Sequence, residues 1–86
     1  MTNLNIRVSP KYEKYITPFT SEEFGALCES IKQIGLIYPI QVNGDGIILD
    51  GHNRFRACNL VNVKPHYALI KFNDVLDEEK FVFQIN

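Results

Sequence analysis

The segment DGHNR, residues 50–54, places side chains that can bind anions at a point where a strand gives way to a helix. The apolar residues 47–49 predict the strand, and the pattern after Gly51 predicts the helix. The first N–H groups of a helix have no intrahelical partner, and the helix dipole adds partial positive charge there. Such a helix start binds anions, and phosphate is the natural ligand.

Each residue of this segment has a candidate role in binding phosphate. Gly51 relaxes the turn and lets a ligand approach the backbone. The N–H groups of His52, Asn53 and Arg54 then form a cradle around the ligand. The Arg54 guanidinium can hold phosphate oxygens bidentately and stays charged at any relevant pH. We therefore expect a phosphate site formed by Gly51, His52, Asn53 and Arg54.

Asp50 and His52 are the candidate catalytic residues, and each has more than one interpretation. The Asp50 carboxylate either caps the helix that follows or holds a Mg²⁺ ion that shares phosphate oxygens. His52 can donate to an oxyanion or transfer a proton, although a histidine in a tight turn is more often exposed or bonded to a nearby carbonyl. The roles of these two side chains stay open at this point.

Composition bounds the kind of protein. Hydrophobic residues make up 45% of the 86-residue chain, enough for one small packed domain, and we expect a single domain over residues 1–86.

The formal net charge of −1 gives no broad positive surface for DNA, so DNA contact is local or made elsewhere in a longer protein. No apolar run reaches the length of a membrane span and no signal peptide is evident, so we expect a cytoplasmic location.

The two cysteines carry no metal or redox motif. Cys28 and Cys58 are far apart in the sequence and have no Cys-x-x-Cys or Cys/His spacing around them, so we expect buried, reduced thiols. The Ser-His-Asp order and the P-loop pattern are also missing from the sequence. Classical hydrolases and P-loop enzymes therefore lose support.

The first half of the chain predicts a strand, a connection and a helix. Alternation of apolar and polar residues over 4–8 predicts a short strand, and residues 9–19 predict an irregular connection. Residues 20–34 predict a helix that opens with a Thr20/Glu23 capping box and ends at Gly35.

The second half predicts a hairpin, a helix, a strand and a last helix. Residues 38–42 and 46–49 flank an Asn-Gly-Asp turn, so they predict a β-hairpin whose first strand begins at Pro39 or runs along an edge. Residues 51–60 predict a helix, 65–72 a strand, and 73–85 a further helical stretch. The expected fold is α+β, with a small mixed β-sheet and packed helices.

Two stretches of this sequence resemble the ParB/sulfiredoxin-like superfamily. They are IKQIGLIYPI (31–40) and ILDGHNRFRA (48–57), and the resemblance extends over roughly residues 6–86. It implies a ParB N-terminal/sulfiredoxin-like fold with a nucleotide-phosphate pocket at residues 50–54. Within the superfamily, ParB-type partition proteins bind and hydrolyse CTP while clamping DNA, sulfiredoxins use ATP with a catalytic cysteine, and an archaeal free-serine kinase uses ADP.

Departures from the family patterns separate these uses. Gly51 stands where sulfiredoxins carry their cysteine, and Pro18 is followed by Phe19 rather than by the kinase's histidine. Partition proteins usually have Gln at the position of Tyr38 and Gly-Glu-Arg-Arg at 51–54. Similar Asp-Gly-His-Asn-Arg domains are found at the N-termini of plasmid and phage ParB-like proteins, ahead of DNA-binding helices, so the chain resembles an N-terminal domain excised from a longer protein.

The resemblance thus implies a nucleotide-binding domain of a DNA partition, maintenance or regulatory protein. Its expected ligands are a nucleoside triphosphate, CTP or ATP, with Mg²⁺ at Asp50, and hydrolysis coupled to DNA binding is one expectation. DNA would be contacted through the full-length protein, and a homodimer of the domain is one open alternative. The competing interpretation is a small ATP/ADP-dependent phosphotransferase or nuclease that uses the same segment.

Overall fold

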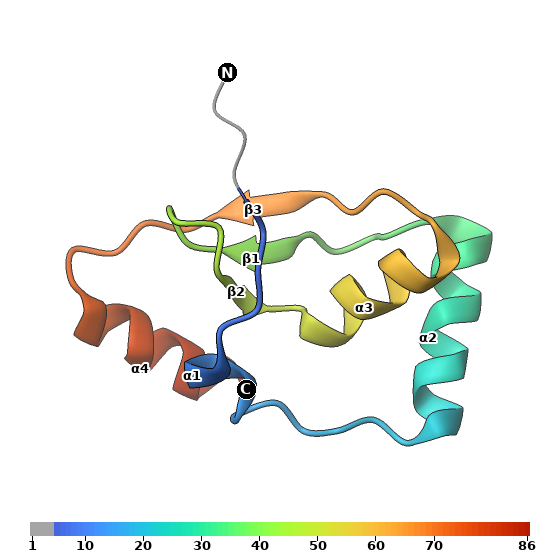
Figure 1. Ribbon diagram of the computed structural model, residues 1–86, viewed down its shortest axis with the longest axis horizontal. Coiled ribbons are helices and arrows are strands. Elements are labelled where there is room, and N and C mark those ends of the chain that lie inside the picture. The colour runs from blue at the N-terminus through green and yellow to red at the C-terminus, as the bar shows by residue number, and fades with distance from the viewer. Residues whose placement is uncertain (1–4) are drawn as a thin grey trace.

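The computed structural model describes residues 5–86, which form helices packed on a three-stranded sheet (Figure 1). The order of the elements is α1 (Pro10–Glu13), α2 (Ser21–Ile34), β1 (Ile40–Val42), β2 (Ile48–Asp50), α3 (His52–Val61), β3 (Tyr67–Leu69) and α4 (Val75–Ile85). In Figure 1, α2 and α3 lie at one end of the sheet, and α1 and α4 lie together at the other. The predicted α+β fold is confirmed.

The sheet is mixed, with strand order β2-β1-β3. Strand β1 pairs antiparallel with β2 and parallel with β3, in a register that sets Gln41 opposite Ala68. Because β1 is the central strand, the edge alternative is wrong, and Pro39 immediately precedes the first residue of the strand, Ile40. The N–H of Ile40, the first that the strand can offer, donates to the His66 carbonyl at 3.0 Å.

The predicted hairpin is confirmed, and Asn43 organises its turn. The Oδ1 atom of Asn43 accepts hydrogen bonds from the backbone N–H groups of Asp45 at 2.9 Å and Ile47 at 3.0 Å. An asparagine side chain that bonds its own turn in this way is a frequent device in tight turns. The hairpin delivers β2, and hence Asp50, to the start of α3.

The N-terminal region departs from prediction in two places. The strand predicted over 4–8 is a single parallel bridge between Arg7 and Ile47, and residue 4 lies outside the described residues. The connection predicted as irregular contains the short helix α1. Pro10 stands in its first turn, where its fixed φ suits a helix and its missing N–H costs nothing, so a single turn forms without any periodic pattern.

The predicted helix over 20–34 is confirmed as α2. The hydroxyl of Thr20 accepts from the Glu23 N–H at 3.1 Å, and the Glu23 carboxylate accepts from the Thr20 N–H at 2.9 Å. These two bonds are the predicted capping box. Gly35 closes the helix with a positive φ of 80°, which a residue with a side chain rarely adopts.

The core consists of three clusters of buried side chains. One joins α2 to α3 through Cys28, Ile31, Ala57 and Cys58. Another joins α1, β2 and α4 through Tyr12, Leu49 and Val82. The third lies on the hairpin and contains Ile40, Val42 and Ile48. Both cysteines are free and buried, as predicted.

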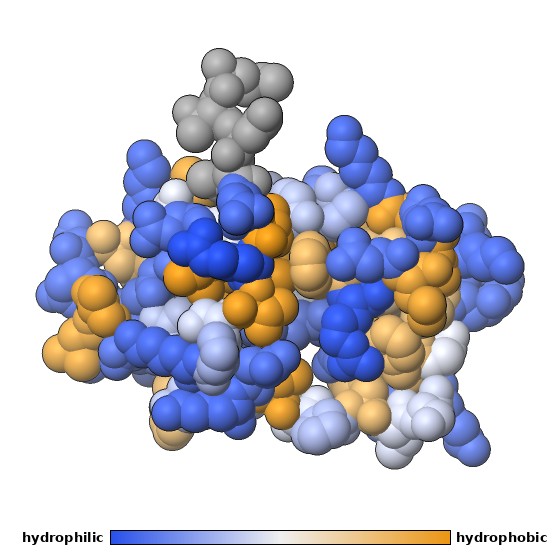
Figure 2. Space-filling model, in the orientation of Figure 1, coloured by the Kyte–Doolittle hydropathy of each residue, from blue (hydrophilic) through white to orange (hydrophobic). Residues whose placement is uncertain are grey.

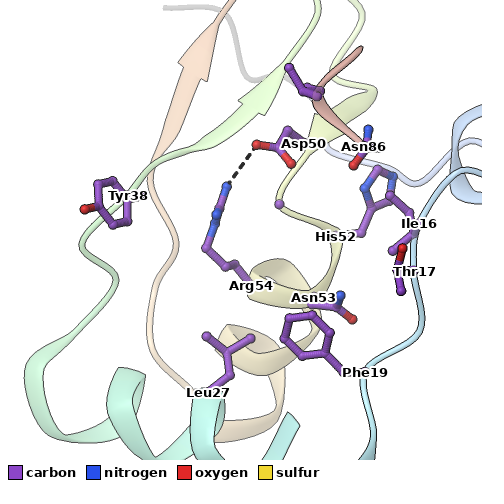
Figure 3. Close-up of a pocket in the computed structure, with 12 residues that line it drawn as sticks. Ile16, Thr17, Phe19, Leu27, Tyr38, Asp50, His52, Asn53, Arg54 and Asn86 are labelled. Carbon is purple, nitrogen blue, oxygen red and sulfur yellow. Dashed lines mark ion pairs between the residues drawn. The ribbon is translucent and has the colours of Figure 1, made fainter. Parts of the chain in front are cut away.

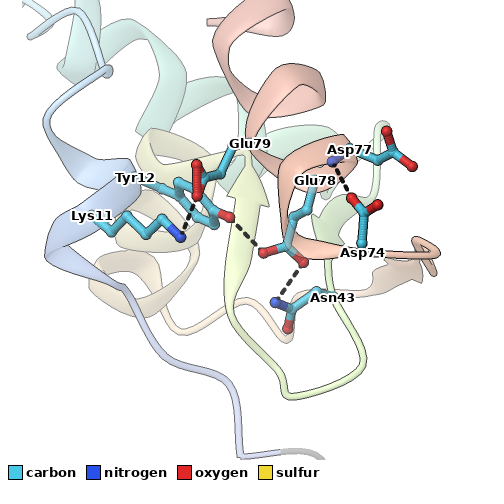
Figure 4. A network of polar contacts seen from close by, with 7 residues as sticks. All are labelled: Lys11, Tyr12, Asn43, Asp74, Asp77, Glu78 and Glu79. Atoms are coloured by element: carbon cyan, nitrogen blue, oxygen red, sulfur yellow. Dashed lines mark hydrogen bonds and ion pairs between the residues drawn. The ribbon is translucent and has the colours of Figure 1, made fainter.

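A polar network connects α1, the hairpin turn and α4 (Figure 4). The Glu78 carboxylate accepts from the Tyr12 hydroxyl and, at 2.9 Å, from Nδ2 of Asn43. Lys11 forms a 2.8 Å ion pair with Glu79 beside it. Because Tyr12 is buried and its hydroxyl donates to a carboxylate, the phenol pKa is raised above its ordinary value. The network holds α4 against the hairpin.

The surface in Figure 2 mixes hydrophilic and hydrophobic residues, with several separate hydrophobic patches on the face shown. Exposed hydrophobic side chains include Leu76 and Phe83 of α4 and Leu60 of α3. Within residues 5–86, none of the helices has both the length and the apolar character needed to cross a membrane.

Candidate functional site

Gly51 forms the corner between β2 and α3, and only glycine fits there. Its φ is +101°, in the left-handed region that side chains disfavour. A Cβ at this position would lie 2.9 Å from Nη2 of Arg54 and 3.2 Å from Cγ1 of Ile40. The glycine therefore permits both the turn and the close approach of the Arg54 guanidinium to the backbone.

Helix α3 begins without a side-chain cap. The N-cap residue is Gly51, which has no side chain to accept a hydrogen bond from the helix amides. The first helical bond runs from the Phe55 N–H to the Gly51 carbonyl at 2.8 Å. The N–H groups of His52, Asn53 and Arg54 precede that bond, so they have no intrahelical acceptor. They are available as the predicted cradle for an anion.

Asp50 does not cap α3, so that alternative is wrong. It is the last residue of β2, one position before the N-cap, and its carboxylate lies 3.5 Å from Nη2 of Arg54. The glycine turn directs the Asp50 side chain toward the guanidinium rather than toward the helix amides (Figure 3).

The Arg54 guanidinium is held loosely beside the cavity. Its only described polar contacts are the Asp50 carboxylate and the Pro39 carbonyl, both at 3.5 Å from Nη2. Its Nε is buried and has no hydrogen-bond partner among the described residues. An arginine with weak contacts and an unused donor can turn toward an incoming oxyanion at little cost.

His52 is buried with neither ring nitrogen paired. Its exposed fraction is 5%, and within residues 5–86 neither Nδ1 nor Nε2 has a hydrogen-bond partner. Burial lowers its pKa below the ordinary value, and the carboxylates of Glu13 and Asp50 oppose that shift. The imidazole is therefore neutral at pH 7, with one donor and one acceptor nitrogen. Buried polar atoms without partners are rare in proteins, so this side chain points to a ligand or an ordered water.

Asn53 is the polar residue between His52 and Arg54, and its side chain is anchored at one end. The Oδ1 atom accepts a hydrogen bond from Nη1 of Arg56 at 3.0 Å. The other end, Nδ2, makes no hydrogen bond to a described residue.

These side chains line a cavity of about 400 Å³ (Figure 3). All of the predicted residues contribute, namely Asp50, Gly51, His52, Asn53 and Arg54. Tyr38, the residue before Pro39, also lines the cavity, and its side chain is 70% exposed. Arg7 does not line it. Its guanidinium donates to the Asp45 carbonyl at the hairpin turn at 3.0 Å.

Sequence reasoning missed the opposite wall of the cavity. That wall comes from the connection before α2 and from the end of α4, through Ile16, Thr17, Phe19, Ile85 and Asn86. Asn86 also donates to the Leu49 carbonyl at 3.2 Å, which fixes the end of α4 beside β2. No periodic pattern or motif marks residues 14–19, so the sequence held no signal for the part of this wall that precedes α2.

The residues present are compatible with Mg²⁺ only when a ligand completes the site. Among the described residues, no group of three or more His, Cys, Asp or Glu side chains is arranged to hold a metal ion. Mg²⁺ is often bound by one or two carboxylates together with substrate phosphates, and Asp50 can supply one carboxylate. The metal role of Asp50 stays a prediction.

Cys58 does not line the cavity, and burial raises the pKa of its thiol even though Arg54 opposes the shift. A thiol of this kind stays protonated and is a poor nucleophile. With Gly51 in the position of the sulfiredoxin cysteine, the described residues offer no reactive thiol at the corner.

No curated protein matches the chain. The family model of the ParB N-terminal domain matches residues 3–85, which include every element of the fold and all of residues 50–54. The match agrees with the resemblance seen in residues 31–40 and 48–57. The chain belongs to the ParB N-terminal domain family.

Proposed function

We propose that this domain binds a nucleoside phosphate in the cavity at the start of α3, as the nucleotide-binding part of a DNA partition or maintenance protein. Membership of the ParB N-terminal domain family supports the relation to DNA partition. The observation that carries the nucleotide proposal is the buried, unpartnered imidazole of His52 beside uncapped helix amides. Each part of the ligand has a candidate partner in the cavity.

The phosphate group is the part with the strongest support. The free N–H groups of His52, Asn53 and Arg54 and the dipole of α3 favour negative charge at this end of the helix. The Arg54 guanidinium adds a full positive charge and parallel donors suited to phosphate oxygens. The donor nitrogen of His52 would gain the hydrogen bond that it lacks in the free domain.

The rest of the ligand would occupy the less polar part of the cavity. Ligand pockets typically have volumes of about 300–1,000 Å³, and the cavity of about 400 Å³ suits a mononucleotide better than a large molecule. Phe19 and Tyr38 border it with side chains that are 43% and 70% exposed, so either ring can stack on a base. CTP and ATP are the proposed ligands, and Asp50 would supply one carboxylate to a Mg²⁺ ion that accompanies their phosphates.

DNA contact is proposed for the longer protein rather than for this surface. The net charge of −1 supplies little of the positive potential on which nucleic-acid binding depends. Hydrolysis of the nucleotide and formation of a homodimer on nucleotide binding are further parts of the proposal.

The experiment is a calorimetric titration of CTP, ATP, ADP and GTP, each with Mg²⁺, into the wild-type domain. The variants are Arg54→Ala and, as a matched control, Arg7→Ala, whose guanidinium lies outside the cavity. We expect CTP or ATP to bind, with at least about a tenfold loss in Arg54→Ala because a charge-assisted contact is removed, and no loss in Arg7→Ala. Absence of binding in the wild type, or an equal loss in both variants, would contradict the proposal.

A second candidate function is phosphotransfer or phosphodiester cleavage by the same residues. The lowered pKa of His52 favours it, because a neutral imidazole can accept a proton from an attacking hydroxyl or water. Turnover of bound nucleotide by the domain without DNA, lost in His52→Gln, would support this function. Turnover only in the longer protein with DNA would support the partition function.

A further inference from the structure

We propose that Arg56 is a positioning residue that sets which end of the Asn53 amide faces the bound phosphate. This inference rests on the proposed function, and it concerns an exposed residue of α3. Arg56 does not line the 400 Å³ cavity, so it would act through Asn53 rather than on the ligand.

The Arg56 guanidinium stacks on the aromatic ring of Phe24. Its central carbon lies 4.5 Å from the centroid of the Phe24 ring on α2. An arginine stacked on an aromatic face keeps its donors in the plane of the guanidinium and loses much of its side-chain freedom. Helix α2 therefore holds the donor that reaches Asn53 on α3.

The hydrogen bond from Arg56 determines the chemistry of the Asn53 side chain. A guanidinium carries donors and no acceptor, so only the Oδ1 end of an amide can pair with it. The 3.0 Å contact is between Nη1 of Arg56 and Oδ1 of Asn53. The amide cannot be reversed without losing this bond, so the NH₂ end is the one left free.

The free end is available to a ligand. Asn53 lines the cavity of about 400 Å³ and also a hollow of about 210 Å³, which Arg56 borders. Because Arg56 holds Oδ1, Nδ2 is the end of the amide that is left as a donor. A reversed amide would instead present a carbonyl oxygen to an anionic ligand, which is unfavourable. Arg56 thus adds one donor to the phosphate site without touching the phosphate.

A double-mutant cycle separates this role from direct contact. Binding of CTP, ATP and pyrophosphate, each with Mg²⁺, is measured for the wild type, Arg56→Met, Asn53→Ala and the double variant. Losing one hydrogen bond predicts about a 3- to 10-fold weaker affinity in Arg56→Met. We expect Arg56→Met to have no further effect in the Asn53→Ala background, because the only route of action has been removed.

Two conservative variants sharpen the test. Arg56→Lys keeps a donor for Oδ1 and should restore affinity to within about threefold of wild type. Asn53→Asp keeps an acceptor for Arg56 but removes the NH₂ donor, so it should bind more weakly than Asn53→Ala. Urea unfolding of every variant shows whether a change in affinity accompanies a loss of fold.

The inference is overturned if Arg56→Met leaves wild-type affinity unchanged, or if it weakens the Asn53→Ala variant by the same factor. A ligand-free measurement keeps it distinct from the proposed function. NMR relaxation of the Asn53 side-chain NH₂ group should show a rigid amide in the wild type and a mobile one in Arg56→Met. A rigid amide in a domain that binds no nucleotide would defeat the proposed function alone, whereas equal mobility in both proteins would defeat the positioning role.

Discussion

The Arg54 guanidinium lies 3.5 Å from the Asp50 carboxylate, and the glycine turn between β2 and α3 separates the two residues. Both side chains are about one-third exposed, at 27% and 34%, so the pair contributes less than about 1 kcal/mol to stability. The pair instead keeps a positive and a negative group at the same wall of the cavity. Phosphate would compete with Asp50 for Arg54, and Mg²⁺ would attract both phosphate and Asp50.

Asp50→Asn tests this arrangement. Removing the carboxylate charge should leave binding of metal-free CTP or ATP equal or several-fold tighter, because the repulsion of phosphate by Asp50 is lost. It should also remove the enhancement that Mg²⁺ gives to wild-type binding. Calorimetry with and without Mg²⁺ measures both effects, and an undiminished Mg²⁺ enhancement in Asp50→Asn would refute the metal role.

His52 should make the stability of the free domain depend on pH. Its pKa is lowered in the folded state by burial, so below about pH 6.5, the ordinary histidine pKa, the unfolded chain binds a proton that the folded chain does not. The free energy of unfolding therefore decreases as pH falls through about 6.5 toward the folded-state pKa. Above about pH 6.5, His52 makes no pH-dependent contribution to the free energy of unfolding. Urea unfolding between pH 5 and 8 should show the loss in the wild type and not in His52→Gln. His66→Gln, at an exposed histidine, is the control and should keep the wild-type slope.

Anion binding should have the opposite pH dependence at the same residue. Protonation of His52 adds a positive charge inside the site, and a bound anion in turn raises the His52 pKa. Affinity for sulfate, whose own charge is constant in this range, should therefore increase as pH falls from 8 to 5. A sulfate affinity that is flat with pH, or equally steep in His52→Gln, would argue against an anion beside the imidazole.

Gly51→Ala should damage both stability and binding. A non-glycine residue at a φ of +101° costs about 1–3 kcal/mol, and the added Cβ would contact Nη2 of Arg54 at 2.9 Å. Gly44→Ala is the matched control, because no atom lies within 4 Å of its added Cβ and its φ is not in the positive range. Thermal unfolding and nucleotide titration of the two variants measure the effect. Equal behaviour of both would show that the Gly51 turn tolerates a side chain.

The elements with strong local signals were predictable from the sequence. The Thr20/Glu23 capping box, the Asn-Gly-Asp turn and the helix end at Gly35 each depend on a few neighbouring residues, and the structure has all three. The same holds for Asp50–Arg54, because consecutive residues at a strand-to-helix corner must share one wall. Local chemistry was sufficient for these features.

Features that depend on distant contacts were not predictable. The short bridge at Arg7 and the central place of β1 follow from how strands pair in space, which period and composition do not encode. The far wall of the cavity, with Phe19 and Asn86, depends on how α4 and the connection before α2 fold back on the sheet. The loss of the Asp50 cap follows from a one-residue shift of the helix start, which lies within the usual error of such boundaries.

Tyr12→Phe tests whether the network around Glu78 holds α4 in place. The variant keeps the buried ring and removes the hydroxyl that donates to the Glu78 carboxylate, leaving Asn43 as its described donor. Hydrogen bonds to charged groups contribute about 1.5–3 kcal/mol, and partial exposure of this carboxylate places the expected loss in free energy of unfolding near the lower end. Tyr15→Phe is the matched control, since Tyr15 is 38% exposed and its hydroxyl makes no hydrogen bond to a described residue. Urea unfolding at pH 7 measures both variants. Because α4 ends at the cavity through Asn86, a Tyr12→Phe domain as stable as wild type would mean that the other contacts of α4, both apolar and polar, hold it in place without the Tyr12 hydroxyl.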